Sequence, residues 1–385
     1  MSDTHYSACG HRDVVRAGQN CRVHILLERL VDGRVAVVRD DADRSEVTDD
    51  DLASLVRREE AERHPRWVWS DTRSWYPSLL RAGVRVERCV DLRLSHAILR
   101  SSMLTSGSAI ASAPPGLWDA AVPVDGGGEV EAAALFELDA EEPSSVPSAA
   151  DEFAAQQDAL TTCAEPGRLR LLLAAESAGA LIAAEMQHAG LPYSVERHDA
   201  LLTALLGPRP RYGRPAVMEE LVAQLRGLLD APALNPDSPP EVLKALQRAG
   251  LMVTSTRSWE LRELEHPAIA PLLRYKKLSR LASANGWTWL DTWVADGRFR
   301  PDYIPGGVVT GRWATRGGGA LQLPKEVRGA VVADPGWKLV VADAAQLEPR
   351  ILTGLAADTA MAAAGRGRDL YAGIVATGAV AERAH

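Results

Sequence analysis

The sequence has few cysteines and no long apolar run. Its four cysteines lie too far apart for the close pairs of a zinc site and are too few for a disulfide framework, so we expect reduced thiols. No apolar run reaches the roughly 18 residues of a membrane helix, and residues 1–10 lack the basic start and apolar core of a signal peptide. These absences predict a cytoplasmic protein without a membrane partner. The cysteines are Cys9, Cys21, Cys89 and Cys163.

Basic charge is scarce over the whole chain but not over its last third. The chain has 43 basic and 51 acidic residues, a net charge of −8. Residues 270–385 hold 15 basic against 10 acidic residues, which leaves 28 against 41 in residues 1–269. All of the lysines also lie after position 243. The last third is therefore a candidate polyanion-binding region, although chance clustering of arginine is an open alternative.

The length of 385 residues predicts two or three domains, since single domains usually have about 100–200 residues. Two β-rich runs, Cys21–Leu27 and Arg34–Arg39, precede a helical pattern from Asp49 to His64 and predict a small α/β unit. Residues 106–148, rich in Gly, Pro and Ser, indicate a linker or irregular segment.

The chain after residue 148 has mainly helical periodicity, which changes to short strands and tight turns from Asp302. The predicted fold class is therefore mixed, α/β with an α+β character. We expect helices at Ala149–Thr162, Leu169–Gly190, Arg197–Leu206, Met218–Leu229, Pro239–Gly250, Trp259–Glu265 and Ile269–Ala284.

The segment from Lys338 to Arg350 concentrates features of a catalytic site. Its apolar run predicts a buried strand that ends at Asp343, and a helical pattern follows from Gln346 to Asp358, with Pro349 in its first turn. A strand-end aspartate can hold a metal ion or cap the following helix, and both remain open. No phosphate-binding loop of the G-x-x-x-x-G-K-[ST] type is present, which disfavours a P-loop ATPase.

Three further motifs precede Asp343. They are Thr310-Gly-Arg312, Leu321-Gln322-Leu-Pro324, and Arg328 before a strand predicted at Ala330–Ala333. Together with Asp343-Ala-Ala-Gln346-Leu-Glu348-Pro-Arg350, their order resembles the family A DNA polymerases, the DNA polymerase I family. Weaker resemblance extends back to Arg274-Tyr-Lys-Lys-Leu and Asn235-Pro-Asp-Ser238.

The resemblance implies template-directed DNA synthesis, in which Mg2+ assists transfer of a deoxynucleotide to a primer 3′-hydroxyl. Asp343 matches the first metal-binding aspartate of the family, with the Ala344 carbonyl as a second oxygen ligand. Glu348 matches the glutamate that excludes ribonucleotides. Gln346 and Arg350 match the same nucleotide-binding segment, and a structural role is an equal alternative for both. The residue at 344 is usually tyrosine in the family, and Pro349 replaces an aliphatic residue.

The resemblance also implies two partners, primer-template DNA and deoxynucleoside triphosphates, for a protein expected to be a monomer. Arg312 matches an arginine that contacts the primer-terminal base pair, and Gln322 a residue near the template-primer. Phosphate contacts are expected from Thr310, Arg328, Lys276 and Lys277. For the three cations among them, a solvated surface charge is the alternative.

The resemblance predicts four parts, and it begins with a degenerate 3′–5′ exonuclease-like domain at 1–110. Asp91 matches that domain, but the cluster of about four acids that a nuclease needs is not found, and Asp71 and Asp151 have no assigned place. An active exonuclease is thus the least favoured function. The other parts are a linker and helix at 111–165, a thumb within 166–300 and a partial palm at 301–385.

The family's fingers helix and second catalytic carboxylate are expected after the last residue, His385. The sequence is therefore interpreted as truncated before the fingers. The alternative function is a non-catalytic DNA-binding remnant or a truncated fragment that is inactive alone.

Overall fold

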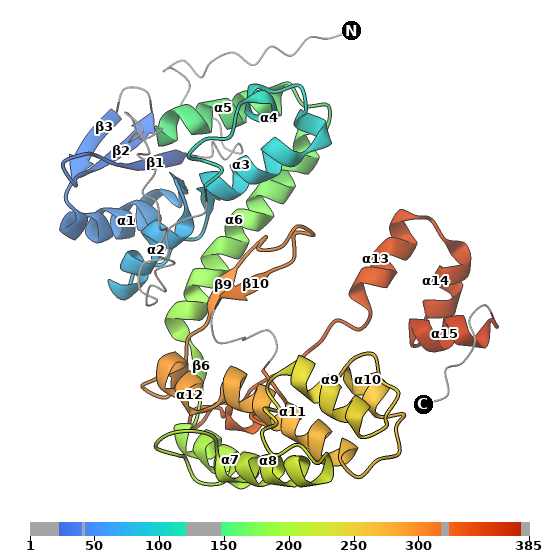
Figure 1. Ribbon diagram of the computed structural model, residues 1–385. Coiled ribbons are helices and arrows are strands. Elements are labelled where there is room, and N and C mark those ends of the chain that lie inside the picture. The colour runs from blue at the N-terminus through green and yellow to red at the C-terminus, as the bar shows by residue number, and fades with distance from the viewer. Residues whose placement is uncertain (1–22, 41–42, 121–147, 317–322, 379–385) are drawn as a thin grey trace. The chain divides into compact units, whose positions relative to one another are not determined.

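The computed structural model describes residues 23–40, 43–120, 148–316 and 323–378, and these form two compact units. The first extends to Val331 and the second begins at Val332 (Figure 1). The units are described separately below. The predicted mixed α/β class is confirmed, because helices dominate and a five-stranded sheet lies in the first unit. The predicted domain boundaries remain a prediction.

A mixed five-stranded sheet organises the start of the first unit. Its strands have the order β3-β2-β1-β4-β5; β1 pairs antiparallel with β2 and parallel with β4. Both β-rich runs form the predicted strands. The bounds are β1 His24–Arg29, β2 Val35–Asp40, β3 Asp43–Val47, β4 Arg66–Trp69 and β5 Cys89–Asp91.

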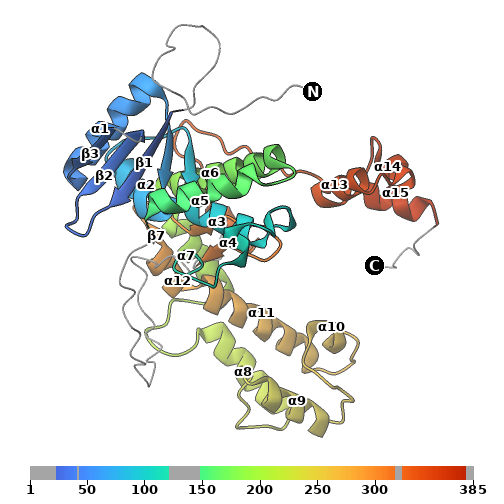
Figure 2. The same cartoon turned by 90° about the horizontal axis from the view of Figure 1, so that it is seen from above.

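Helices cover both faces of this sheet, because successive side chains of a strand point to opposite faces. Ile25 and Leu27 pack in one core with residues of α1 and α2, while Leu26 packs in another with Phe153 of α5. Figure 2 shows α1 and α5 on opposite sides of the sheet. The helices are α1 Asp49–Arg63, α2 Thr72–Arg81, α3 Leu92–Ser101, α4 Ala109–Ser112 and α5 Ala149–Thr161, with a 3-10 turn at Met103–Thr105.

The long helix α6, Pro166–Ala189, joins the sheet to the rest of the first unit. It begins three residues earlier than expected, because Pro166 suits a first helical position. It ends at Gly190, whose φ of 67° favours glycine, as the sequence predicts. Small residues allow close approach to other elements: a Cβ at Gly179 would lie 3.3 Å from the Trp313 ring. Ser177 is buried, and its hydroxyl accepts a hydrogen bond from the Asp91 N–H at 3.1 Å.

The helices after α6 enclose a second large core. It contains Leu202, Leu225, Leu246, Leu272 and Tyr275, all fully buried. The predicted helix at Trp259–Glu265 is wrong beyond Leu261, because residues 262–265 turn away from the helix. The helices are α7 Val195–Leu206, α8 Ala216–Leu228, α9 Pro239–Arg248, α10 Ser258–Leu261, α11 Ile269–Asn285 and α12 Trp287–Trp293.

Short strands complete the first unit. A three-stranded sheet joins β6 Leu191–Pro192, β7 Val294–Ala295 and β8 Arg298–Phe299, and β9 Asp302–Ile304 pairs antiparallel with β10 Ala314–Arg316. The strand predicted at Ala330–Ala333 is wrong. Residues 328–330 form a 3-10 turn, and the following Val331 makes one isolated bridge to Tyr193.

The second unit consists of three short helices after an extended segment. They are α13 Leu347–Leu355, α14 Thr359–Gly365 and α15 Leu370–Ala376. The predicted buried strand at residues 338–342 is wrong: the segment has no strand pairing, and Val340 and Val341 are over 90% exposed. A strand is stable only beside a partner strand, and the described residues of this unit contain none.

No described helix combines the length and the apolar character needed to cross a membrane.

Candidate functional site

Asp343 and Ala344 lie in the extended segment before α13. Both are exposed, and among the described residues no hydrogen bond or ion pair involves the Asp343 carboxylate. A carboxylate followed by a free peptide carbonyl offers two oxygen ligands of the hard type that Mg2+ prefers. The donor chemistry therefore fits the cation that the sequence predicts here.

Gln346 and Arg350 both form contacts inside the second unit. The Gln346 side chain donates to Asp369 and accepts from the Leu370 N–H at 2.7 Å. Arg350 donates to the carbonyls of Gly365 and Arg368, each at 2.9 Å. These bonds join the start of α13 to the loop between α14 and α15, because the acceptors lie at the ends of those helices. Both side chains therefore hold α13, which follows Asp343, against the loop between α14 and α15.

Glu348 stands in the first turn of α13 and is exposed. An acid in a first turn is stabilised by the positive end of the helix dipole. Pro349 lies at the third helical position, within the first turn, where a proline interrupts no hydrogen bond. The predicted order of aspartate, turn and helix thus forms without the predicted strand.

In the first unit, Lys276 lines a cleft of about 310 Å³ between α9 and α11. Its ammonium group donates to the Thr256 carbonyl and lies 3.3 Å from the Thr256 hydroxyl. Ser279, Arg280 and Ser283 lie on the same face of α11 at helical spacing and line the cleft too. The cleft thus combines two cations with the hydroxyl groups of Thr256, Tyr275, Ser279 and Ser283.

The acid in this cleft, Asp237, already pairs with Arg214 at 2.7 Å. Burial opposes ionisation of Asp237, but hydrogen bonds from Arg214, Tyr275 and Ser279 outweigh it and lower its pKa. The pKa of Lys276 is also lowered, first by burial and then by the charge of Arg280. Neither Lys276 nor Arg280 pairs with an acid of the described residues, and two such neighbouring cations favour an anionic ligand.

The other predicted DNA contacts are distributed over the first unit. Lys277 pairs with Glu326 at 2.8 Å, and Arg328 is exposed in the 3-10 turn and donates to the Leu323 carbonyl at 3.0 Å. Thr310 and Arg312 are exposed in the loop between β9 and β10. Gln322 lies outside the described residues. Of these candidates, Lys276 lines the cleft between α9 and α11.

Acids at the carboxyl end of the N-terminal sheet serve as helix caps. Asp91 is buried and accepts from the N–H groups of Thr72 and Leu94, and Asp71 caps α2 through the Ser74 N–H. Burial raises the pKa of Asp91 to about 6, although both N–H bonds oppose this shift. Asp151 is exposed in the first turn of α5.

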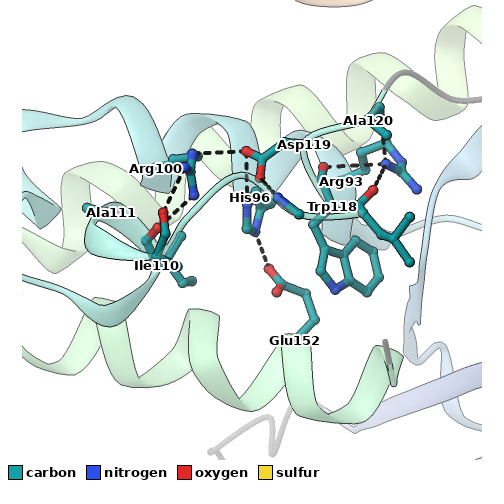
Figure 3. A network of polar contacts seen from close by, with 12 residues as sticks. Arg93, His96, Arg100, Ile110, Ala111, Trp118, Asp119, Ala120 and Glu152 are labelled. Carbon is teal, nitrogen blue, oxygen red and sulfur yellow. Dashed lines mark hydrogen bonds and ion pairs between the residues drawn. The ribbon is translucent and has the colours of Figure 1, made fainter. Parts of the chain in front are cut away.

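Two further acids near this end contact basic side chains. In Figure 3 the carboxylate of Glu152 points at His96, whose Nδ1 lies 2.8 Å from Glu152 Oε1. Asp119 lies between Arg100, at 2.9 Å, and the other ring nitrogen of His96, at 3.5 Å. The pairs join α3 to α5 and to the segment before residue 121.

Sequence analysis missed most of the cleft around Lys276. Arg280 and Ser283 could have been found, because they follow Lys276 at spacings of four and seven residues on one helix face. Thr256 could not, because it reaches the cleft through the fold of the loop before α10. That loop is held by Glu260, which accepts from the Thr254 N–H at 2.7 Å.

Comparison with known proteins identifies relatives over part of the chain. No protein-family model matches it. DNA polymerase I of Chloroflexus aurantiacus is 32% identical over 143 residues, which are 34% of this chain and 14% of that protein. The thermostable DNA polymerase I of Thermus thermophilus is 28% identical over 123 residues, 29% of this chain and 14% of that protein. The matched region is therefore about a seventh of these relatives.

A solved structure shares the fold over most of the chain. It is the POL domain of Pol1 from M. smegmatis, in a complex with a DNA primer-template and dNTP. It aligns with 92% of this chain and 63% of its own, with a TM-score of 0.57 and 17% identity.

Proposed function

The chain is a relative of the family A DNA polymerases, and from this relationship we propose that it takes part in template-directed DNA synthesis. The reaction would be transfer of a deoxynucleotide to the 3′-hydroxyl of a primer. The observation that carries the proposal is the shared fold over 92% of the chain with a polymerase domain that binds primer-template and dNTP. The motifs around Thr310, Arg312 and Asp343 agree with it.

The cleft at Lys276 supports binding of the DNA backbone. Lys276 and Arg280 supply positive charge, and the Thr256 hydroxyl, which accepts from Lys276, can donate to a phosphate oxygen. Such contacts carry no sequence information, which suits an enzyme that must accept any template. Arg312 would then contact the primer-terminal pair in the minor groove, where the acceptors of all base pairs are alike.

The second unit would supply the chemistry. Asp343 and the Ala344 carbonyl would hold Mg2+, which usually binds through one or two carboxylates together with substrate phosphates. Bound there, the cation would neutralise charge on the triphosphate and lower the pKa of the primer hydroxyl. Glu348 would limit the space beside the sugar, while Gln346 and Arg350 hold the helices that carry it.

The binding step is tested by the salt dependence of primer-template affinity, measured by fluorescence anisotropy. Each phosphate contact that is lost should reduce the slope of log K against log salt by about 0.9. We expect Lys276→Ala and Arg280→Ala each to do so and to weaken binding of all sequences alike. Arg168→Ala, which removes an exposed arginine from the start of α6, is the matched control. Unchanged slopes in both cleft variants would exclude this cleft as a phosphate site.

A second candidate function is DNA binding without synthesis. It is favoured by the exposure of Leu339, Val340 and Val341, because a catalytic aspartate is usually held by a paired strand. Both functions require DNA binding, but only the first includes extension of a primer. A primer-extension assay therefore distinguishes them.

A further inference from the structure

Three potential metal ligands meet at the amino end of the N-terminal sheet. Oxygen atoms of Glu60 and Glu87 and a ring nitrogen of His64 all lie within 4.8 Å of one another. This is the one such group of three among the residues that the structure describes. It lies where β4 and β5 begin, whereas Asp71 and Asp91 follow the opposite ends of these strands. The group thus lies at the opposite end of these strands from Asp71 and Asp91, the acids considered for an exonuclease.

The fold holds the Glu60 carboxylate and the backbone of His64 in place. Glu60 Oε1 accepts from the Trp67 indole at 2.7 Å and from the Glu87 N–H at 3.3 Å, so its carboxylate has a fixed orientation. His64 ends α1 in the left-handed region with a φ of 45°, its N–H bonded to the Glu60 carbonyl. Arg88 donates to the His64 carbonyl. These contacts are of the kind that orient metal ligands.

The charges at the group are not balanced. Two carboxylates face one imidazole, and the His64 ring lies 3.6 Å from Glu87. The nearby Arg63 pairs instead with Glu59 at 3.3 Å. The carboxylate oxygens of Glu60 and Glu87 lie within 4.8 Å of each other and repel. A cation between the carboxylates would remove this repulsion.

We propose that Glu60, His64 and Glu87 bind a divalent cation of the zinc type. One imidazole and two carboxylates supply nitrogen and oxygen donors of the kinds that Zn2+ accepts, and water can take the fourth position. The side chains of His64 and Glu87 are 59% and 64% exposed, so the ion can enter and keep its water. The cation would fasten the end of α1 to the residues that lead into β5.

Zinc binding to the full chain tests the proposal. Isothermal titration with Zn2+, in millimolar Mg2+ to saturate oxygen-only sites, should show one site that His64→Ala and Glu87→Gln each weaken at least about tenfold. Glu62→Gln removes an exposed carboxylate from the same helix and should bind Zn2+ as the wild type does. At a hundredfold excess over the wild-type Kd, Zn2+ should raise the Tm of the wild type by about 5 °C and that of both site variants by at most about half as much.

Three results would overturn the proposal. One is the absence of Zn2+ binding by the wild type, and another is wild-type affinity in both site variants. The third is an equal loss in Glu62→Gln, which would show that binding depends on surface charge alone. Circular dichroism verifies that each variant is folded. If His64→Ala does not fold, Glu87→Gln still tests the proposal, because the Glu87 side chain is exposed.

Discussion

At the scale of single residues, the surroundings decide what each carboxylate does. Asp91 is buried and caps a helix, whereas Glu260 is half-buried and its pKa falls to about 2, chiefly through a hydrogen bond from the Ser255 hydroxyl. Asp343 is exposed and has no partner among the described residues. Of the three, Asp343 alone keeps its oxygens available for a ligand.

The buried Asp91 should make stability depend on pH. Its folded pKa of about 6 lies above the unfolded value near 4, so its contribution is greatest below pH 4 and is lost as the pH rises through 6. The loss for two pKa units is about 3 kcal/mol. Asp91→Asn removes this titration. We therefore expect the unfolding free energy of the wild type to fall relative to Asp91→Asn by about that amount between pH 4 and 7.

Urea unfolding followed by circular dichroism measures this difference. Asp151→Asn is the control for the same change at an exposed first-turn aspartate. A gap between the wild type and Asp91→Asn that stays constant from pH 4 to 7 would contradict the assigned pKa.

At the scale of elements, helices could be predicted from the sequence, but strands only in part. The helix α11 depends on a local pattern, and its predicted bounds differ from Ile269–Asn285 by one residue. The segment 338–342 has the apolar run of a buried strand, yet a strand also needs a partner, which no local pattern supplies. In the same way, Asp343 could be predicted from its motif, whereas Thr256 joins Lys276 only through the fold.

The packing of α14 on α15 requires glycine at position 373. A Cβ there would lie 1.9 Å from the Ala364 carbonyl oxygen, so one helix must move. We expect Gly373→Ala to expose the second unit to proteases and to accelerate its amide exchange at least tenfold, which corresponds to about 1.4 kcal/mol of local opening.

The matched control is Gly354→Ala in α13. A Cβ at this position would contact nothing within 4 Å, and alanine favours a helix over glycine by up to about 1 kcal/mol. Its amide exchange should be equal to or slower than that of the wild type. Equal exchange in Gly373→Ala and the wild type would show that α14 and α15 do not pack as described.

At the scale of the whole molecule, charge separates the chain into two parts. Residues 1–269 carry an excess of acid, whereas residues 270–385 carry 15 basic against 10 acidic residues. The second part includes both cations of the cleft, Lys276 and Arg280, and the candidate metal ligand Asp343. Its positive field would attract DNA and the negatively charged triphosphate.

Primer extension by the protein expressed from its complete reading frame tests the central claim most directly. With Mg2+, a primer-template and all four deoxynucleotides, we expect the wild type to extend the primer. Asp343→Ala should lower the rate at least about a thousandfold, because the loss of metal stabilisation costs several kcal/mol, and should leave DNA affinity within a factor of about three. Asp334→Ala, in the same unit, is the control and should extend normally. Near-normal extension by Asp343→Ala would contradict the account.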